Sequence, residues 1–171
     1  YSTLNGLSFI LDVPLSNEGK GINKGVDLTL ERYLSEGFYY LLTGSVFDSK
    51  YCGKDSNWFS TRYNYRFLFN VLGGKEWIFG SRNQHVFGPN IKCTFRGGER
   101  YTPVNEEESL KFGKLILYED KMYENRFSPK LKIDFTLNYK LNKRFMTHEI
   151  ALKVLNLTGI KEYYRHRFEF E

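Results

Sequence analysis

The segment from residue 131 to residue 141 (LKIDFTLNYKL) alternates apolar and polar residues at every step. A period of two puts successive side chains on opposite faces, so the segment is predicted to be a β-strand with one apolar and one polar face. Its length matches the ~9–11 residues with which a tilted strand crosses a bilayer, whereas a strand of a water-soluble sheet usually has about 5–6. The alternation therefore favours a transmembrane β-barrel strand.

The register of this strand assigns a side to each residue. We expect the odd-numbered residues to face lipid: Leu131, Ile133, Phe135, Leu137, Tyr139 and Leu141. We expect the even-numbered residues to face a water-filled lumen: Lys132, Asp134, Thr136, Asn138 and Lys140.

Five further segments carry the same pattern. They are predicted strands at residues 25–34, 38–47, 61–77, 85–96 and 145–156. An earlier partial strand is expected within residues 1–13, and residues 17–24 (NEGKGINK) are predicted to form a loop because they are rich in Gly and Asn. Consecutive strands are expected to pair antiparallel in chain order, with the pairing across residues 97–129 the least constrained. The fold class is therefore all-β, with up-and-down strands.

The connections between these strands alternate in length. Short turns are predicted at residues 35–37, 80–84 and 142–144. Longer connections are predicted at residues 48–60, at residues 97–129 and after residue 157. Outer-membrane barrels combine tight periplasmic turns with larger extracellular loops, so this asymmetry supports a membrane barrel. About six strands cannot close a barrel when the smallest take ~8, so further strands are expected elsewhere.

The longest connection, residues 97–129, mixes aromatic and aliphatic residues with acidic ones. Loops longer than ~12–15 residues are usually functional or disordered. We expect this one to be extracellular and to be the part of the chain that meets ligand or a surface partner. Its aromatic and aliphatic residues suggest packing onto its own hairpin, the plug or a partner. The other interpretation is that residues 114–118 simply extend the sheet above the membrane.

Composition and charge narrow the classes of function. Aromatic residues make up 18% of the chain, with 13 Tyr and 15 Phe, which suits the aromatic girdles of a barrel or the aromatic core of a soluble all-β protein. The net charge is +5, but Lys and Arg are interspersed with acidic residues and form no basic run, so nucleic acid is not an expected partner.

Residue patterns for catalysis or metal binding do not emerge. The sequence has no GxSxG, HExxH or Cys–His nucleophile signature, and its three His residues are widely spaced, so no enzymatic activity, cofactor or metal site is predicted. Cys52 falls in a predicted outer loop and Cys93 on a lipid-facing position, so a disulfide between them is not expected.

Substrate contacts, if the barrel transports, would come from polar lumen-facing residues and outer loops. The alternation nominates Arg66, Asn70, Lys92, Arg96, Asp134, Asn138, Glu149 and Lys153. Their alternative role is to solvate the inner wall and to hydrogen-bond a plug.

Four segments carry a family resemblance. They are residues 17–51 (NEGKGINKGVDLTLERYLSEGFYYLLTGSVFDSKY), 61–77 (TRYNYRFLFNVLGGKEW), 95–104 (FRGGERYTPV) and 148–164 (HEIALKVLNLTGIKEYY). In order and spacing they resemble the C-terminal barrel of TonB-dependent outer-membrane receptors, in the form with an N-terminal carboxypeptidase-regulatory-like domain. The resemblance implies that residues 1–171 are part of a 22-stranded plugged barrel, without the plug, the earlier strands and the last strand.

The resemblance also implies a function and a location. Receptors of this family import nutrients across the outer membrane of gram-negative bacteria, driven by the proton-motive force that TonB relays to the plug. The expected partners are outer-membrane lipid, the remainder of the barrel with its plug, TonB through the missing N-terminal region, and a surface lipoprotein. A passive or structural barrel and a soluble β-sheet binding module are the alternative functions.

Overall fold

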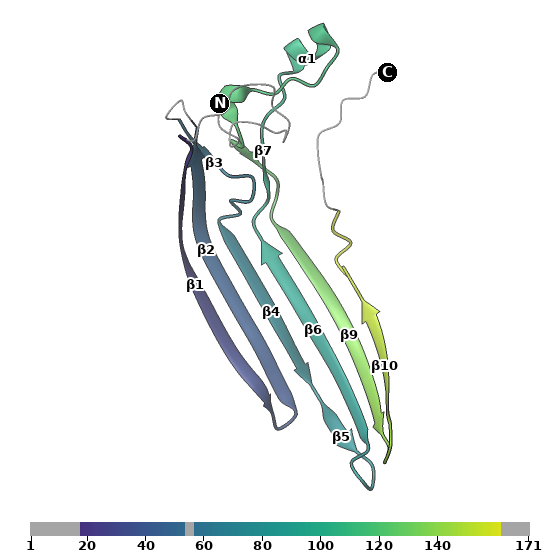
Figure 1. Ribbon diagram of the computed structural model, residues 1–171. Helices are drawn as coiled ribbons and strands as arrows, with labels where there is room; N and C mark the ends of the chain where they lie inside the picture. Colours follow the sequence, from purple (N-terminus) through teal and green to yellow (C-terminus); the bar gives the residue numbers. More distant parts are fainter. Residues whose placement is uncertain (1–17, 54–56, 162–171) are drawn as a thin grey trace.

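The computed structural model describes residues 18–53 and 57–161, and these form one tall, twisted, single-layer sheet (Figure 1). Its principal strands are β1 (Lys20–Ser35), β2 (Phe38–Cys52), β4 (Phe67–Lys75), β6 (His85–Arg96), β9 (Lys130–Asn142) and β10 (Thr147–Val154), which lie side by side in that order. Every neighbouring pair is antiparallel. The predicted all-β class and the predicted pairing in chain order are confirmed, including the pairing of β6 with β9 across the longest connection.

The tight turn between β1 and β2 shows why the sequence forms hairpins here. Glu36 and Gly37 both have positive φ, 55° and 75°, as the central residues of a type I′ turn require. A Cβ on Gly37 would lie 2.4 Å from the carbonyl oxygen of Glu76, so the position needs glycine for space as well. The predicted short turn is therefore confirmed, and it sits at the same end of the sheet as the turns after β5 and β9 (Figure 1).

Several predicted boundaries are wrong. β1 begins at Lys20 and β2 runs to Cys52, because Lys20 pairs with Cys52 and Lys24 with Asp48. Residues 20–24, which were predicted to form a loop, are therefore strand. The predicted strand 61–77 is broken: β3 (Trp58–Ser60) pairs with β2 beyond the end of β4, while β5 (Trp77–Phe79) pairs with β6. A turn occupies the start of the predicted strand instead, and Arg66 there has a φ of 68° that interrupts the extended backbone.

The other boundaries agree more closely with the alternation. β6 has the predicted bounds, and β9 differs by about one residue at each end. β10 begins at Thr147 and ends at Val154, so it is shorter than predicted. Beyond it the amide of Leu157 still donates to the carbonyl oxygen of Ile133, so the chain continues beside β9 after the strand has ended.

The register aligns the faces of all six strands. Residues that pair directly across antiparallel strands point to the same side, so the pairing assigns each strand residue to one face of the sheet. One side, the apolar face, includes Val26, Leu28, Leu30, Tyr40, Leu42, Val46, Phe67, Phe69, Val71, Ile91, Cys93, Phe95, Leu131, Ile133, Phe135, Leu137, Tyr139, Leu141, Ile150, Leu152 and Val154. The other, the polar face, includes Asp27, Thr29, Glu31, Thr43, Ser45, Thr94, Lys132, Thr136, Lys140 and Ala151, with Leu41 and Leu72 as an apolar pair within it.

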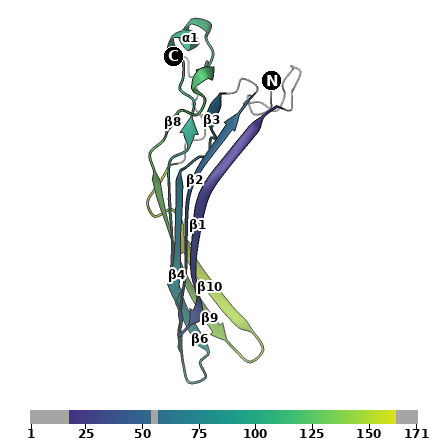
Figure 2. The ribbon, with the colours of Figure 1, turned by 90° about the vertical axis from the view of Figure 1, so that its left-hand side faces the viewer.

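No second layer covers the apolar face within the described part of the chain (Figure 2). Val26 and Leu28 on β1 are 74% and 73% exposed, and Ile150 on β10 is 70% exposed. The buried hydrophobic residues among those described are Tyr51 and Cys52, both at the far end of β2. The described strands also do not close into a barrel. The sheet therefore has no hydrophobic core of its own.

The connection between β6 and β9 contains several short elements of regular secondary structure. It contains β7 (Arg100–Tyr101) paired with β8 (Asn125–Arg126), the helix α1 (Glu106–Phe112) and the 3₁₀ turn η2 (Glu119–Lys121). Asn105 caps α1 by accepting a hydrogen bond from the Glu108 amide, and Gly113 ends it in the left-handed conformation. Residues 114–118 form no strand, only a single bridge between Leu117 and Val104, so they do not extend the sheet.

Two further observations complete the description. Among the described residues, no helix has the length and hydropathy to cross a bilayer. Cys52 and Cys93 are both free thiols, and Cys52 is a buried residue at the end of β2 rather than part of an outer loop.

Candidate functional site

Seven of the eight residues nominated from the alternation lie on the polar face of the sheet. They are Asn70, Lys92, Arg96, Asp134, Asn138, Glu149 and Lys153. The eighth, Arg66, lies just before β4 at a position with positive φ, so the strand alternation used to place it does not apply. For all eight residues, contact with a substrate stays a prediction.

A ladder of hydroxyl and amide groups crosses the middle of the polar face. Asn70 donates from Nδ2 to Oγ1 of Thr43 at 3.2 Å and accepts from Oγ1 of Thr94 at 2.9 Å. The ladder joins β2, β4 and β6 through side chains that sit directly opposite each other in the register. Both the nitrogen and the oxygen of the Asn70 amide are thus engaged in holding three neighbouring strands together.

A hollow of about 320 Å³ lies nearer the loop end of the polar face, between β6, β9 and the chain after β10. Its lining brings together three of the nominated residues, namely Lys92, Arg96 and Asp134. The other lining residues are Thr94, Lys130, Lys132, Asn156 and Ile160. Four of these eight side chains are cationic and one is acidic, so the hollow carries positive charge.

Asp134 is the centre of this hollow's hydrogen bonding. Its Oδ1 atom accepts from the backbone amide of Asn156 at 2.8 Å and lies 3.9 Å from Nζ of Lys132. Asn156 has a φ of 56°, and its side chain both accepts from the amide of Ile160 and donates to its carbonyl oxygen. The sequence predicts Asn156 at the end of a strand, and the structure places it just beyond β10. The available signal was the turn preference of Asn, which tolerates the left-handed conformation that Asn156 adopts.

The remaining nominated residues lie apart from the hollow. Glu149 forms an ion pair with Lys140 at 3.8 Å toward the short-turn end, and Asn138 lies between Gly88 and Ala151 in the register. Lys153 lies opposite Thr136 on the neighbouring strand. The structure thus groups three of the eight and disperses the others along the wall.

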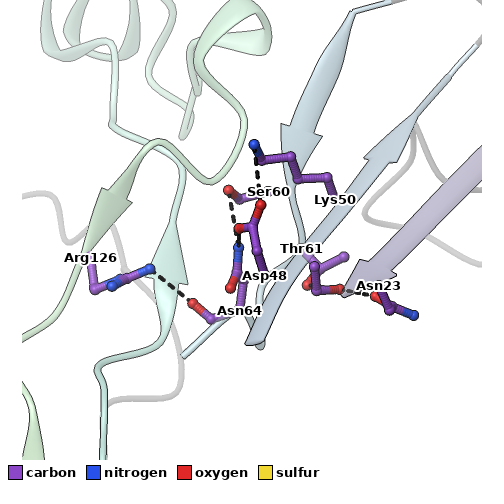
Figure 3. A network of polar contacts seen from close by, with 8 residues as sticks. Asn23, Asp48, Lys50, Ser60, Thr61, Asn64 and Arg126 are labelled. Atoms are coloured by element: carbon purple, nitrogen blue, oxygen red, sulfur yellow. Dashed lines mark hydrogen bonds and ion pairs between the residues drawn. The ribbon is translucent and has the colours of Figure 1, made fainter. Parts of the chain in front are cut away.

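A second polar cluster was not predicted, and it lies at the loop end of β2 (Figure 3). Asn64 is fully buried, and its Nδ2 donates to Oδ1 of Asp48 at 2.8 Å and to Oγ of Ser60 at 3.4 Å. Asp48 also pairs with Lys50 at 3.2 Å. The carbonyl oxygen of Asn64 accepts from Arg126 on β8 at 3.0 Å, so this residue ties the long connection to the sheet.

Several arginines lie at this end of the sheet, near the cluster. Arg62 and Arg96 both contact Glu99, at 3.2 and 3.3 Å. Arg100 donates from Nη1 to the carbonyl oxygens of Tyr123 and Glu124 at 3.1 and 3.0 Å. Burial lowers the pKa of Arg100 and of Arg126 below the usual value, and the positive charge of neighbouring arginines lowers both further.

The base of the long connection packs on the end of β2, while its tip does not. Tyr51 contacts the ring of Tyr123 at 6.4 Å between centroids, and its hydroxyl lies 3.5 Å from Sδ of Met122. The tip, in contrast, exposes Leu110 and Phe112 on α1 at 73% and 59%. The base of this segment therefore contacts β2, which lies outside its own hairpin of β6 and β9, and the tip is an exposed apolar surface.

Aromatic side chains gather at the opposite end of the apolar face, beside the short turns. Trp77 packs on Phe87 with ring centroids 6.0 Å apart, and His85 stacks between Phe79 and Tyr139 at 5.2 and 6.0 Å. The Nδ1 atom of His85 lies 2.7 Å from the Tyr139 hydroxyl, so the histidine is held in the aromatic row. Rings with a polar edge beside an apolar surface are typical of a membrane interface.

Within the described residues, no three His, Cys, Asp or Glu side chains lie close enough to hold a metal ion. The described strands form a sheet with one apolar and one polar face. Comparisons of the chain with protein-family models, with curated proteins and with solved structures found no match.

Proposed function

We propose that this chain forms part of the wall of a large outer-membrane β-barrel. The observation that carries this proposal is the continuous apolar face, which is exposed across all six principal strands and has no covering layer among the described residues. In water an exposed apolar face of this extent would promote aggregation. In a bilayer the lipid tails cover such a face, so no second protein layer is needed.

The dimensions of the sheet support the same proposal. β9 has 13 residues, which at ~3.3 Å per residue span about 43 Å along the strand, and a tilt of about 45° brings this close to the thickness of a hydrocarbon core. The aromatic row beside the short turns fits one girdle of such a barrel. Backbone groups at the outer edges of β1 and β10 have no strand partner among the described residues, so in lipid they require further strands.

We further propose that the barrel is that of a TonB-dependent receptor that imports a nutrient. The resemblance of four segments to such receptors supports this, and so does a polar face fit to line an aqueous lumen and contact a plug. In this proposal the partners are outer-membrane lipid, the rest of the barrel and its plug, TonB acting through a region outside this chain, and a surface lipoprotein at the exposed tip of α1. Neither catalysis nor a cofactor is part of the proposal.

The test uses the complete protein that contains this chain, expressed in a gram-negative host. We expect it to fractionate with the outer membrane and to migrate faster on gels before boiling than after, as folded barrels do. Uptake of labelled iron chelates, oligosaccharides, peptides and vitamins is then measured with and without TonB. We expect one class to be taken up only when TonB is present.

Other outcomes would select the alternative functions. Uptake that persists without TonB and after the proton-motive force is collapsed would identify a passive barrel. Recovery of the folded protein from the aqueous fraction without detergent would contradict the membrane barrel and favour a soluble binding module.

A further inference from the structure

A hollow of about 730 Å³ lies at the loop end of the apolar face, distinct from the hollow on the polar face. In the β1–β2 register Lys24 lies opposite Asp48 and Val26 opposite Val46, so these four residues share the apolar side of the sheet. The hollow is completed by Gly25, Phe47, Lys50, Ser60, Arg66 and Arg100.

The lining of this hollow has more positive charge than its own carboxylate balances. Lys24, Lys50, Arg66 and Arg100 are cationic, and Asp48 is the one acidic lining residue. Asp48 is already engaged by Lys50 at 3.2 Å and by Asn64 at 2.8 Å. Among the described residues, no hydrogen bond or ion pair engages the side chains of Lys24 and Arg66. These two cations are therefore available to a ligand.

Further positive charge lies behind the hollow, where Asp48 compensates it only in part. Arg126 lies next to the cluster, and the positive charges of Arg100 and Arg66 add to burial in lowering its pKa. The guanidinium Nε atoms of Arg100 and Arg126 are buried without a hydrogen-bond partner in the described structure. Such a group of guanidinium and ammonium donors matches the oxygen-rich, multiply charged form of a phosphate.

The position of the hollow identifies the source of that phosphate. Toward the short turns the same two strands continue with Val26, Leu28 and Leu30, which belong to the surface that we propose faces lipid. A cationic site immediately beyond the apolar surface, on the same side, lies at the depth of lipid headgroups. We infer that this hollow binds a phosphate group of an outer-membrane lipid headgroup; the inference rests on the membrane barrel proposed above.

The experiment compares two double variants of the complete receptor, reconstituted in bilayer discs. Lys24→Gln with Arg66→Gln removes two cations from the apolar side, whereas Lys92→Gln with Lys132→Gln removes two from the polar side as a matched control. Binding is measured with lipid A that carries both phosphates and with the same lipid after dephosphorylation. Surface cations each contribute modestly, so we expect the first variant to bind phosphorylated lipid A about 10- to 30-fold more weakly and the control to match the parent.

Four results would contradict the inference in different ways. Equal losses in both variants would exclude this hollow as the phosphate site, as would equal binding of the two lipids by a parent protein that also fails to bind millimolar inorganic phosphate. If the parent binds the two lipids equally but binds inorganic phosphate, and the Lys24→Gln, Arg66→Gln variant loses that phosphate binding, the hollow is a site for free phosphate and the lipid source is overturned. If the unmutated receptor does not insert into bilayers at all, the membrane barrel itself is refuted. This failure is seen at reconstitution, before any lipid A is titrated, so it is distinct from the loss of the phosphate site.

Discussion

Phe135 and Thr136 are adjacent residues of β9 that the register places on opposite faces. Phe135 lies opposite Ile91 and Val154, whereas Thr136 lies opposite Asn90 and Lys153. In the proposed membrane barrel Phe135 faces lipid near the bilayer midplane, where a guanidinium must be desolvated. We therefore expect Phe135→Arg to destabilise the folded barrel by about 2–4 kcal/mol. Thr136→Arg should have little effect, since its side chain reaches water. Urea unfolding of the complete barrel in vesicles measures both, and similar losses for the two variants would show that the faces are wrongly assigned.

Asn64 is a residue whose importance the sequence did not reveal, because nothing in its local pattern marks a fully buried amide. Its side chain holds Asp48, and its carbonyl oxygen holds Arg126. Asn64→Ala would remove the amide that donates to Asp48 and Ser60. Because the Asp48 carboxylate is half-exposed and keeps its ion pair with Lys50, we expect a loss of about 0.5–1.5 kcal/mol, that of an ordinary hydrogen bond. We expect faster proteolysis within residues 97–129 on intact cells, while Asn138→Ala on the polar wall leaves the rate unchanged. Equal cleavage rates in the two variants would refute this role for Asn64.

The alternation predicts the bounds of some strands closely and those of others poorly, because pairing with a neighbouring strand can override the local pattern. β6 and β9 are central strands with both faces consistently patterned, so a period of two located them closely. The early part of β1 was mistaken for a loop because its Gly and Asn residues carry a local turn preference, which pairing with the long β2 overrides. The break between β3 and β4 was invisible because residues 61–66 keep the alternating composition while Arg66 adopts positive φ.

The β1–β2 turn offers a prediction for an element. Gly37 and Gly159 both have positive φ, so alanine at either position costs about 1–2 kcal/mol of backbone strain. At Gly37 the added Cβ would also meet the carbonyl oxygen of Glu76, whereas nothing lies within 4 Å at Gly159. We therefore expect Gly37→Ala to reduce the folded, heat-modifiable fraction of the complete barrel more than Gly159→Ala. A larger loss at Gly159 would contradict the clash.

At the scale of the whole molecule, the alternation specified the two faces and the chain order, because these depend on nearest-neighbour pairing. The alternation could not show which polar residues meet in one hollow. Lys92, Arg96 and Asp134 converge with Asn156 because the chain continues beside β9 after β10 has ended. The cationic hollow on the apolar side also escaped prediction, since Lys24 and Arg100 come from segments far apart in sequence. Tertiary position, and not local pattern, creates both hollows.

The long connection between β6 and β9 divides into a packed base and an exposed tip, and this division sharpens the test of its function. Met122 and Tyr123 at the base contact Tyr51, so deleting them would disturb the wall itself. Replacing only residues 106–113 of the complete receptor with a short Gly-Ser link removes α1 and its exposed Leu110 and Phe112.

If the tip receives the ligand or a surface partner, the α1 replacement should abolish uptake and surface binding while the heat-modifiable barrel is retained. Lys111→Ala, which removes one charge from α1, serves as a control, because it keeps the apolar side chains Leu110 and Phe112. The physical reason is that an apolar patch on an otherwise solvated loop gains free energy when a partner covers it. Uptake equal to that of the parent, with the barrel intact, would show that the tip has no part in transport and that the segment serves only to brace β2 through its base.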